Sequence, residues 1–169
     1  MTDAVATQTQ VVSKSPIQVK IRWMLRVDLE DVVQVQQDSS NGTIEPVWDA
    51  TRILEQLRDR KYIGIVATTG DKVIGFALYE LCKRHFRVIK LGVHQDYRHM
   101  GVGSKLVGEL TAKLSTTYHN ARKKVTVMVR ERNLSAQLFL RAQRFIATKV
   151  VRGFYEDSGE DGFLMEYRS

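Results

Sequence analysis

The pattern of apolar and polar positions predicts about seven strands. Apolar and polar residues alternate over 17–22 and again over 125–129, which is typical of half-buried strands. A tight turn at Gly70-Asp71 separates two further apolar runs, as in a hairpin. The remaining strands are expected from apolar runs bounded by turn residues: 62–67, 72–81, 87–93, 163–167 and, as a candidate partner of the last, 149–152.

Helical periodicity predicts four helices. They are expected over 29–35, from Asp49 onward, over 102–116 and over 135–143. Asp28 and Asp49 stand where a side chain can cap the first two, although Gln36 interrupts the apolar stripe of the first. The inward-facing residues are expected to be Ile53, Leu54 and Leu57, then Leu106, Val107, Leu110 and Leu114, and finally Leu138, Phe139 and Ala142.

The order of these elements indicates the fold class. The strand–helix–strand segment 87–93, 102–116 and 125–129 is a crossover that requires parallel pairing, whereas the short connections earlier in the chain require antiparallel pairing. We therefore expect one α/β (α+β) domain over residues 16–169, with a mixed, mostly antiparallel sheet of six or seven strands and helices on both faces. Residues 1–15 show no periodicity and are expected to form a flexible tail.

Composition excludes several classes of protein. The 169 residues are 43% hydrophobic and 27% charged, as in an ordinary globular domain. The chain has no apolar run of about 20 residues and no secretory signal pattern at its start, so we expect a cytoplasmic protein without a membrane partner. Cys82 is the single cysteine, which excludes an internal disulfide framework and a cysteine-rich zinc site. No metal is expected.

The chain is basic, with 26 Lys and Arg against 19 Asp and Glu and a net charge of +7. Such a surplus suits a polyanionic partner such as a nucleic acid or a phosphate-rich cofactor, but it is equally common in proteins that bind neither. Zinc-finger, RNP-type and helix-turn-helix signatures are absent from the sequence, so direct nucleic-acid binding is not expected. The basic residues form three groups: Lys83, Arg84, Arg87 and Lys90; Arg98, His99 and Lys105; and Arg122 to Lys124.

The second basic group lies in a glycine-containing turn between a strand and a helix. Gly101 and Gly103 let backbone N–H groups approach a ligand, and the unpaired N–H groups of the following helix favour an anion. Arg98 adds a positive charge with a fork geometry suited to phosphate. A phosphate or pyrophosphate is therefore expected here. The chain has no Walker A motif, and Leu106 stands where a Rossmann fingerprint would need glycine.

The run from Arg98 to Gly103 reads R-x-x-G-x-G and resembles motif A of the GNAT (GCN5-related N-acetyltransferase) superfamily. The segment Asn133-Leu134-Ser135-Ala136, followed by a helix and Phe145, is similar to the Asn-x-x-Ala segment of that family. The opening Ile21-Arg22-Trp23-Met24 also resembles the usual start of these proteins. The resemblance covers residues 17–167 and implies the GNAT fold with acetyl-CoA as co-substrate.

Two further segments resemble one branch of that superfamily, the ribosomal-protein-alanine and other N-terminal protein acetyltransferases. They are Pro46-Val47-Trp48 and the aromatic and acidic segment 152–162. The resemblance implies transfer of an acetyl group to the N-terminal α-amino group of a protein, a ribosomal protein being one candidate. The alternatives are a small-molecule amine as acceptor, or an acyl-CoA-binding regulatory protein with little or no catalysis.

The resemblance also implies which residues bind the co-substrate. Leu91 and Val93 would pair through their backbone with the pantetheine arm, and Asn133 would contact the arm further along. The pyrophosphate would be held by Arg98, Gly101, Val102, Gly103 and Ser104.

The sequence departs from the family pattern at both proton-handling positions. Met128 stands where many relatives have Glu or His, and Leu140 stands where they have the Tyr that protonates the thiolate. Tyr155 is the candidate catalytic residue, acting through held water, with Glu80 and His94 as further candidates. Bulk solvent could also deprotonate an α-amino group, whose pKa is near 8. The third interpretation is a protein that binds acyl-CoA without efficient catalysis.

Overall fold

The computed structural model describes residues 17–39, 46–114 and 122–169, and its elements follow the predicted order. The strands are β1 (Lys20–Trp23), β2 (Tyr62–Thr69), β3 (Lys72–Leu81), β4 (His85–Val93), β5 (Lys124–Arg130), β6 (Ile146–Tyr155) and β7 (Glu160–Arg168). The helices are α1 (Leu29–Ser39), α2 (Ala50–Arg58), α3 (Val102–Ala112) and α4 (Leu134–Ala142). The predicted tail 1–15 and the expected end of the third helix at 115–116 lie outside the described residues, as does the Asn41-Gly42 dipeptide, whose sequence predicts a turn.

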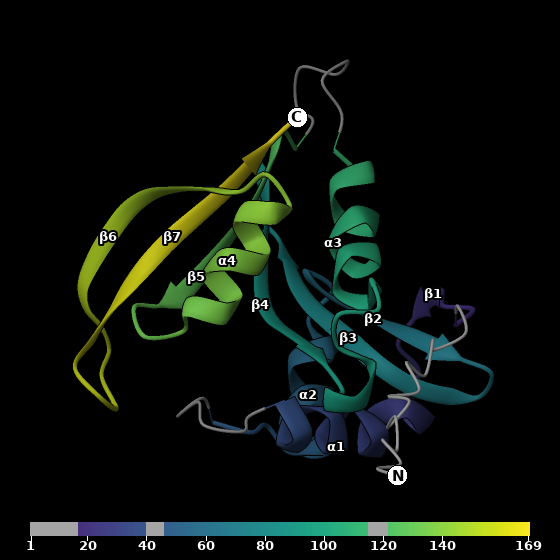
Figure 1. Cartoon of the computed structure of the whole chain (residues 1–169). Coiled ribbons are helices and arrows are strands. Elements are labelled where there is room, and N and C mark those ends of the chain that lie inside the picture. The colour runs from purple at the N-terminus through teal and green to yellow at the C-terminus, as the bar shows by residue number, and fades with distance from the viewer. Residues whose placement is uncertain (1–16, 40–45, 115–121) are drawn as a thin grey trace, which may run out of the picture.

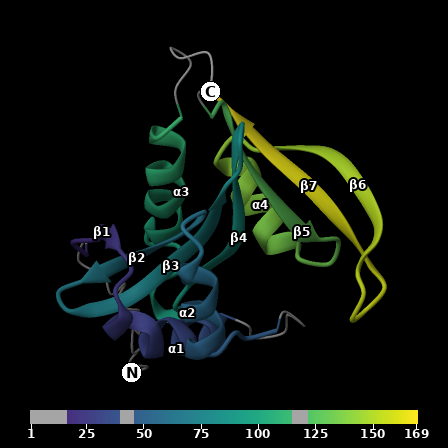
Figure 2. The ribbon, with the colours of Figure 1, turned by 180° about the vertical axis from the view of Figure 1, so that it is seen from behind.

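The strands form one seven-stranded sheet in the order β1-β2-β3-β4-β5-β7-β6. Every neighbouring pair is antiparallel except β4 and β5, which are parallel and are connected through α3. Figures 1 and 2 show the sheet from opposite sides, with α3 and α4 beside its central strands and α1 and α2 together at one end of the view. The predicted mixed, mostly antiparallel sheet is confirmed.

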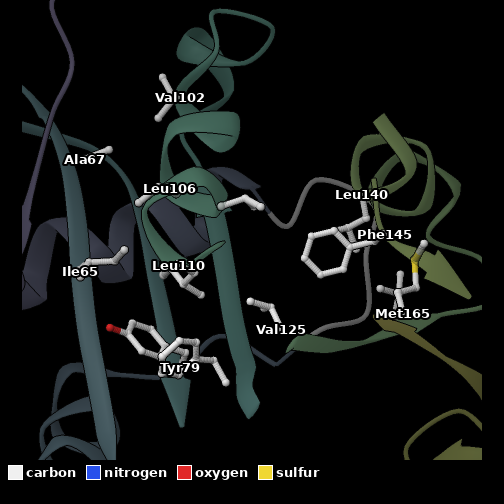
Figure 3. Close-up of a cluster of buried hydrophobic side chains, with 14 of the residues drawn as sticks. Ile65, Ala67, Tyr79, Val102, Leu106, Leu110, Val125, Leu140, Phe145 and Met165 are labelled. Atoms are coloured by element: carbon white, nitrogen blue, oxygen red, sulfur yellow. The ribbon is translucent and has the colours of Figure 1, made fainter. Parts of the chain in front are cut away.

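Each face of the sheet packs against its own pair of helices. On one face, Val102, Leu106 and Leu110 of α3 and Leu140 of α4 bury the inward residues of the central strands (Figure 3). On the other face, the residues of α1 and α2 pack with β2 and β3 in a smaller core: Leu29, Val32, Val35, Ile53, Val66, Val73 and Phe76. Helices therefore cover both faces, as the order of elements requires.

Three local expectations differ from the structure. Residues 17–19 bury apolar side chains as the alternation predicts, but strand pairing with β2 begins only at Lys20. Strand β6 is longer than the expected 149–152. In α4, Leu138 is 54% exposed and Ala142 is exposed, whereas Ala136, Phe139 and Leu140 face the core. The short helix has apolar residues on two faces, and periodicity alone did not identify the one that packs.

The two expected helix caps have different outcomes. Asp49 caps α2, because its Oδ1 accepts the N–H of Arg52 at 2.7 Å. Asp28 precedes α1 but turns its carboxylate backward, where it accepts the Leu25 N–H at 2.7 Å and both terminal nitrogens of Arg22 at 2.6 and 2.7 Å. The expected capping role of Asp28 is therefore wrong. Its buried carboxylate instead fixes the turn between β1 and α1.

No helix within residues 17–39, 46–114 and 122–169 is long and apolar enough to cross a membrane. The expected cytoplasmic location stays a prediction.

The Asp28–Arg22 pair predicts a pH-dependent contribution to stability. The Arg22 guanidinium lowers the pKa of Asp28, so the pair stabilises the fold above the pKa of an unfolded aspartate and loses this effect as pH falls toward the lower native value. We expect Asp28→Asn to reduce the free energy of unfolding at pH 7 by about 2 kcal/mol. The difference from wild type should shrink as pH falls below about 4, the pKa of an unfolded aspartate. Urea unfolding at several pH values measures this, and a difference that stays constant with pH would contradict it.

Candidate functional site

The central feature of the candidate site is the short pairing between the two parallel strands β4 and β5. Their register runs only from His85 opposite Lys124 to Val88 opposite Val127. Immediately after Val88, Ile89 is an extra residue in β4, because β3 pairs with Val88 and Lys90 on either side of it. Such a bulge bends a strand and increases its twist. From Ile89 onward β4 therefore separates from β5, and one backbone edge of each strand faces the opening.

The glycine turn lies at the open end of β4, as the sequence predicts. His99 and Gly101 have positive φ angles of 60° and 80°, and α3 begins at Val102. A Cβ atom at Gly101 would meet nothing within 4 Å, so glycine is needed there for its left-handed backbone rather than for space. The first N–H groups of α3, those of Val102, Gly103 and Ser104, point along the helix axis without intrahelical partners. This arrangement fits a phosphate group.

Gly103 has a different role, because it lets α4 approach α3. A Cβ atom at Gly103 would lie 3.0 Å from the Phe139 ring of α4 and 3.7 Å from a methyl group of Val93. About one turn further along the chain, Gln143, the residue that follows α4, donates from Nε2 to the Ser104 hydroxyl at 3.0 Å. The two helices that border the opening are therefore in contact at its rim, next to the predicted phosphate position.

Arg98 and His94 contact the end of α1 rather than the first turn of α3. The Arg98 guanidinium donates to the carbonyls of Ser39 at 3.0 Å and Asp38 at 3.4 Å, and its Nε lies 3.4 Å from the Val93 carbonyl. His94 Nε2 lies 3.2 Å from the Asp38 carboxylate. The structure thus uses both side chains to attach α1 to the turn that follows β4.

The remaining expected co-substrate residues lie along the opening. Leu91 and Val93 are in the part of β4 that has left β5, with their side chains packed against the larger core. Asn133 begins α4, where its Oδ1 accepts the Ala136 N–H at 3.1 Å. The sequence motif at Asn133 therefore marks a helix cap at the same time as a candidate ligand contact.

The two residues at the usual proton-handling positions have no acid–base chemistry. Met128 lies on β5 just after its pairing with β4 ends, on the face opposite α4, and its sulfur would be 2.8 Å from a Cβ at Gly162. Leu140 is buried in the core between α4 and the sheet. The side of the opening near Met128 is therefore lined by an apolar thioether.

Tyr155 lies at the end of β6, in a hairpin anchored by a residue that sequence reasoning missed. The Arg130 guanidinium stacks 3.9 Å from the centre of the Tyr155 ring and donates to the Asp157 carboxylate at 2.7 and 3.1 Å. Its NH1 also lies 3.5 Å from Glu160, and the Arg130 and Glu160 side chains are each only 5% exposed. Because Arg130 is the last residue of β5, it connects the strand bordering the opening to the β6–β7 hairpin. The alternation of β5 puts Arg130 on the same face as Met128, but nothing in the sequence indicated its partners.

On the other side of the opening, the residues before α2 are held by α1 and β4. The buried Gln36 amide pairs with both backbone groups of Trp48, at 3.0 and 3.1 Å. Lys90 of β4 donates to the Pro46 carbonyl at 2.9 Å and lies 5.1 Å from the centre of a Trp48 ring. Gln36, which interrupts the apolar stripe of α1, thus fixes the position of the Pro46-Val47-Trp48 segment.

Glu80 and Cys82 lie away from the opening. The Glu80 carboxylate pairs with Arg87, on the part of β4 that still pairs with β5. Burial raises the pKa of the Cys82 thiol, and the residue follows the end of β3. Within the described residues, no group of three or more His, Cys, Asp or Glu side chains could hold a metal ion.

Comparisons with known proteins agree with this geometry. A model of the acetyltransferase (GNAT) family matches residues 29–145, which is more than half of the chain. No curated protein sequence matches the chain significantly.

Solved structures with the same fold include Ard1 from Thermoplasma volcanium, with 22% identity, a TM-score of 0.72, and 89% of this chain and 97% of that one covered. A ribosomal-protein-alanine N-acetyltransferase from Brucella melitensis has 19% identity and a TM-score of 0.71, with 89% and 99% covered. NAA60 from Arabidopsis thaliana, determined with acetyl-CoA, has 17% identity and a TM-score of 0.71, with 89% and 98% covered. At these identities the likeness concerns the fold.

The contact between Gly103 and Phe139 predicts how a small substitution affects co-substrate binding. In Gly103→Ala the new methyl group must displace the Phe139 ring, and with it the rim next to the helix N-terminus. We expect acetyl-CoA affinity, measured by isothermal titration, to fall about tenfold, which is 1.4 kcal/mol.

Gly108→Ala is the matched control, because a Cβ atom at Gly108 in the same helix meets nothing within 4 Å. It should keep the affinity and stabilise the fold by up to about 1 kcal/mol. Adding Phe139→Leu to Gly103→Ala should restore binding, and a double variant as weak as the single one would show that the clash is not the cause.

Proposed function

The chain belongs to the acetyltransferase (GNAT) family and uses acetyl-CoA, and from this premise we propose that its acceptor is the N-terminal α-amino group of a protein or peptide. The observation that carries the proposal is the absence of acid–base side chains at Met128 and Leu140. An enzyme of this kind works best on an amine that loses its proton without help.

The pKa of the acceptor amine determines how strongly the rate depends on a general base. At pH 7.4 about one-fifth of an α-amino group with a pKa of about 8 is deprotonated, against about one-thousandth of a lysine side chain with a pKa of about 10.4. Without a general base, the deprotonated fraction of the lysine side chain is about 200-fold smaller, which corresponds to roughly 3 kcal/mol. The α-amino group is therefore the protein amine best matched to this site.

The segments beside the opening support a peptide acceptor. Pro46-Val47-Trp48 is attached to β4 through Lys90, and the hairpin with Phe154 and Tyr155 is attached to β5 through Arg130. Val47 and Phe154 remain 39% and 45% exposed. A peptide N-terminus entering between these segments would meet apolar and aromatic side chains on both sides. The chain's net charge of +7 disfavours a polycationic acceptor such as a polyamine.

We assign the co-substrate contacts as follows. The N–H groups of Gly101, Val102, Gly103 and Ser104 would hold the pyrophosphate, and the free backbone edge at Leu91 and Val93 would pair with the pantetheine arm. Asn133 would contact that arm from the start of α4. Arg98 would act mainly by fixing the turn, since its guanidinium binds the carbonyls at the end of α1.

The reaction needs few side chains. The neutral amine attacks the thioester carbonyl and the C–N bond forms. The C–S bond then breaks, CoA leaves as its thiolate, the proton of the amine passes to water, and water protonates the thiolate. A backbone N–H of the separated β4 edge would stabilise the oxyanion. The Tyr155 hydroxyl would bind the acceptor or the water that takes its proton, while Arg130 stacks on its ring. We propose a cytoplasmic role, with a ribosomal protein as one candidate acceptor, since similarly folded structures include a ribosomal-protein-alanine N-acetyltransferase.

A pH profile tests the choice of acceptor. With a peptide whose only amine is the α-amino group, we expect kcat/KM to rise tenfold per pH unit and level off near pH 8, following the amine. A matched peptide with a blocked N-terminus and one lysine should react about 200-fold more slowly at pH 7.4. Equal rates for the two peptides would refute the α-amine assignment. Acetyl-CoA binding without transfer to either peptide would instead favour a non-catalytic acyl-CoA-binding protein.

Tyr155→Phe tests the active-site role of the hydroxyl. The ring and its stacking on Arg130 remain, so the hairpin should keep its position and the affinity for acetyl-CoA should stay within twofold. We expect kcat/KM for the peptide to fall about tenfold, as for the loss of one hydrogen bond to a charged or reacting group. Unchanged peptide kinetics would assign Tyr155 to packing alone.

A further inference from the structure

The largest concentration of positive charge among the described residues lies at the end of the sheet farthest from the glycine turn. At this end β2, β4 and β5 begin while β3 and β7 end. Nine cationic side chains meet there: Arg60, Lys61, Lys83, Arg84, Arg87, Arg122, Lys123, Lys124 and Arg168. We call this set the basic edge. In Figure 1 the chain end marked C lies at the end of β7, beside the start of β5.

Contacts between the segments show that the basic edge is one continuous surface. Lys123 N–H donates to the Arg84 carbonyl at 3.2 Å, and Lys124 lies opposite Arg168 in the β5–β7 register. The Leu81 N–H reaches the Lys61 carbonyl on the next strand. Four strand spacings of about 4.8 Å separate β2 from β7, so the basic edge is about 19 Å wide.

Few carboxylates neutralise this surface. Three side-chain carboxylates of the described residues lie within it, and each is already paired with its cations: Asp59 with Lys61, Glu80 with Arg87 and Lys61, and Glu166 with Lys124 and Arg168. Glu109 and Lys113, at the end of α3, pair with each other. The basic edge therefore holds a surplus of six positive charges out of the chain's net +7.

Several of these cations have no salt bridge among the described residues. They are Arg60, Lys83, Arg84, Arg122 and Lys123. Four of them, Arg60, Lys83, Arg84 and Lys123, are exposed, and Arg122 is held by the Cys82 carbonyl at 2.7 Å. Like charges collected on a surface repel one another, so a site that keeps them together suits a polyanion.

We propose that the basic edge binds the phosphate backbone of a structured nucleic acid. A nucleic-acid strand carries one charge per roughly 3.4 Å of axis, so a 19 Å row of cations meets several successive phosphates. The large exposed apolar side chains of the described residues lie elsewhere, apart from Ile146 beside Glu166. Among residues 17–39, 46–114 and 122–169, the surface thus offers no exposed aromatic platform of the kind that stacks single-stranded bases and no apolar cluster of the kind that enters a bilayer, which favours a duplex bound through its phosphates.

The position of the basic edge makes this binding compatible with acetyl transfer. The glycine turn lies at the N-terminal end of α3, and the basic edge lies beyond its C-terminal end. The 11 residues of α3 separate the two by about 16 Å. A bound duplex would therefore leave the predicted pyrophosphate position accessible. The sequence could not reveal this surface, because its charges come from four separate segments.

The test measures fluorescence anisotropy of a labelled 20-base-pair RNA duplex, and of a DNA duplex of the same sequence, at 50 and 200 mM salt. If about four phosphates are contacted, affinity should fall on the order of 100-fold between the two salt concentrations. Equal binding of RNA and DNA would assign recognition to the phosphates alone, and preference for RNA would add the 2′-hydroxyl; both support the proposal.

Two double variants with the same net charge separate the surface from the overall charge. Arg84→Glu with Lys123→Glu should weaken duplex binding at least tenfold and reduce its salt dependence. The control variant, Lys20→Glu with Arg26→Glu, changes two exposed residues in and just after β1, the outermost strand beside β2. It should leave the affinity for the duplex within twofold of wild type. Acetyl-CoA affinity should be unchanged in both, which shows that each variant is folded.

Three results would overturn the proposal. They are no duplex binding by wild type at 50 mM salt, equal weakening by the two double variants, and binding to phosphatidylserine vesicles in place of either duplex. The last would assign the basic edge to a membrane surface.

Discussion

The bulge at Ile89 is the constraint on which the candidate site depends. A parallel pair of strands would ordinarily continue to the end of the shorter strand, and here it stops after Val88. The separation leaves a backbone edge exposed beside the positive end of α3, so polar backbone groups suited to an extended amide chain and to a phosphate lie at the same opening. Helix α4, the β6–β7 hairpin and the end of α1 are each attached to its rim.

Several polar side chains at the opening hold loops rather than react. Arg98 and His94 fix the end of α1, Gln36 fixes Trp48, and Arg130 fixes the hairpin. Each pairs with a backbone or carboxylate group and so gives that group a hydrogen-bond or ion-pair partner. A polar group that is buried without a partner is costly for stability. In the proposed function the chemistry is therefore left to backbone groups, to the acceptor's own pKa and to Tyr155, while these four side chains hold the surrounding segments in position.

The sequence predicted the elements that local patterns determine. The alternation of β5, the cap at Asp49 and the glycine turn at Gly101 depend on neighbouring residues, and all three are present. It did not predict partners distant in the chain. Asp28 was expected to cap α1 but binds Arg22, and neither the contact of Arg98 with Ser39 nor the partners of Arg130 were indicated by the sequence. The buried face of α4 was also misjudged, because Leu138 fits a helical stripe yet the sheet lies on the side of Leu140.

The short β4–β5 register has a mechanical consequence. It divides the sheet into two antiparallel halves, β1 to β4 and β5 to β7, whose strands pair over only four residue pairs. A molecule that spans the opening contacts both halves at once and holds them together. By mass action, such a molecule at 100 times its dissociation constant adds about 2.7 kcal/mol to the stability of the whole chain. If the co-substrate occupies the opening as proposed, it is also a structural part of the sheet.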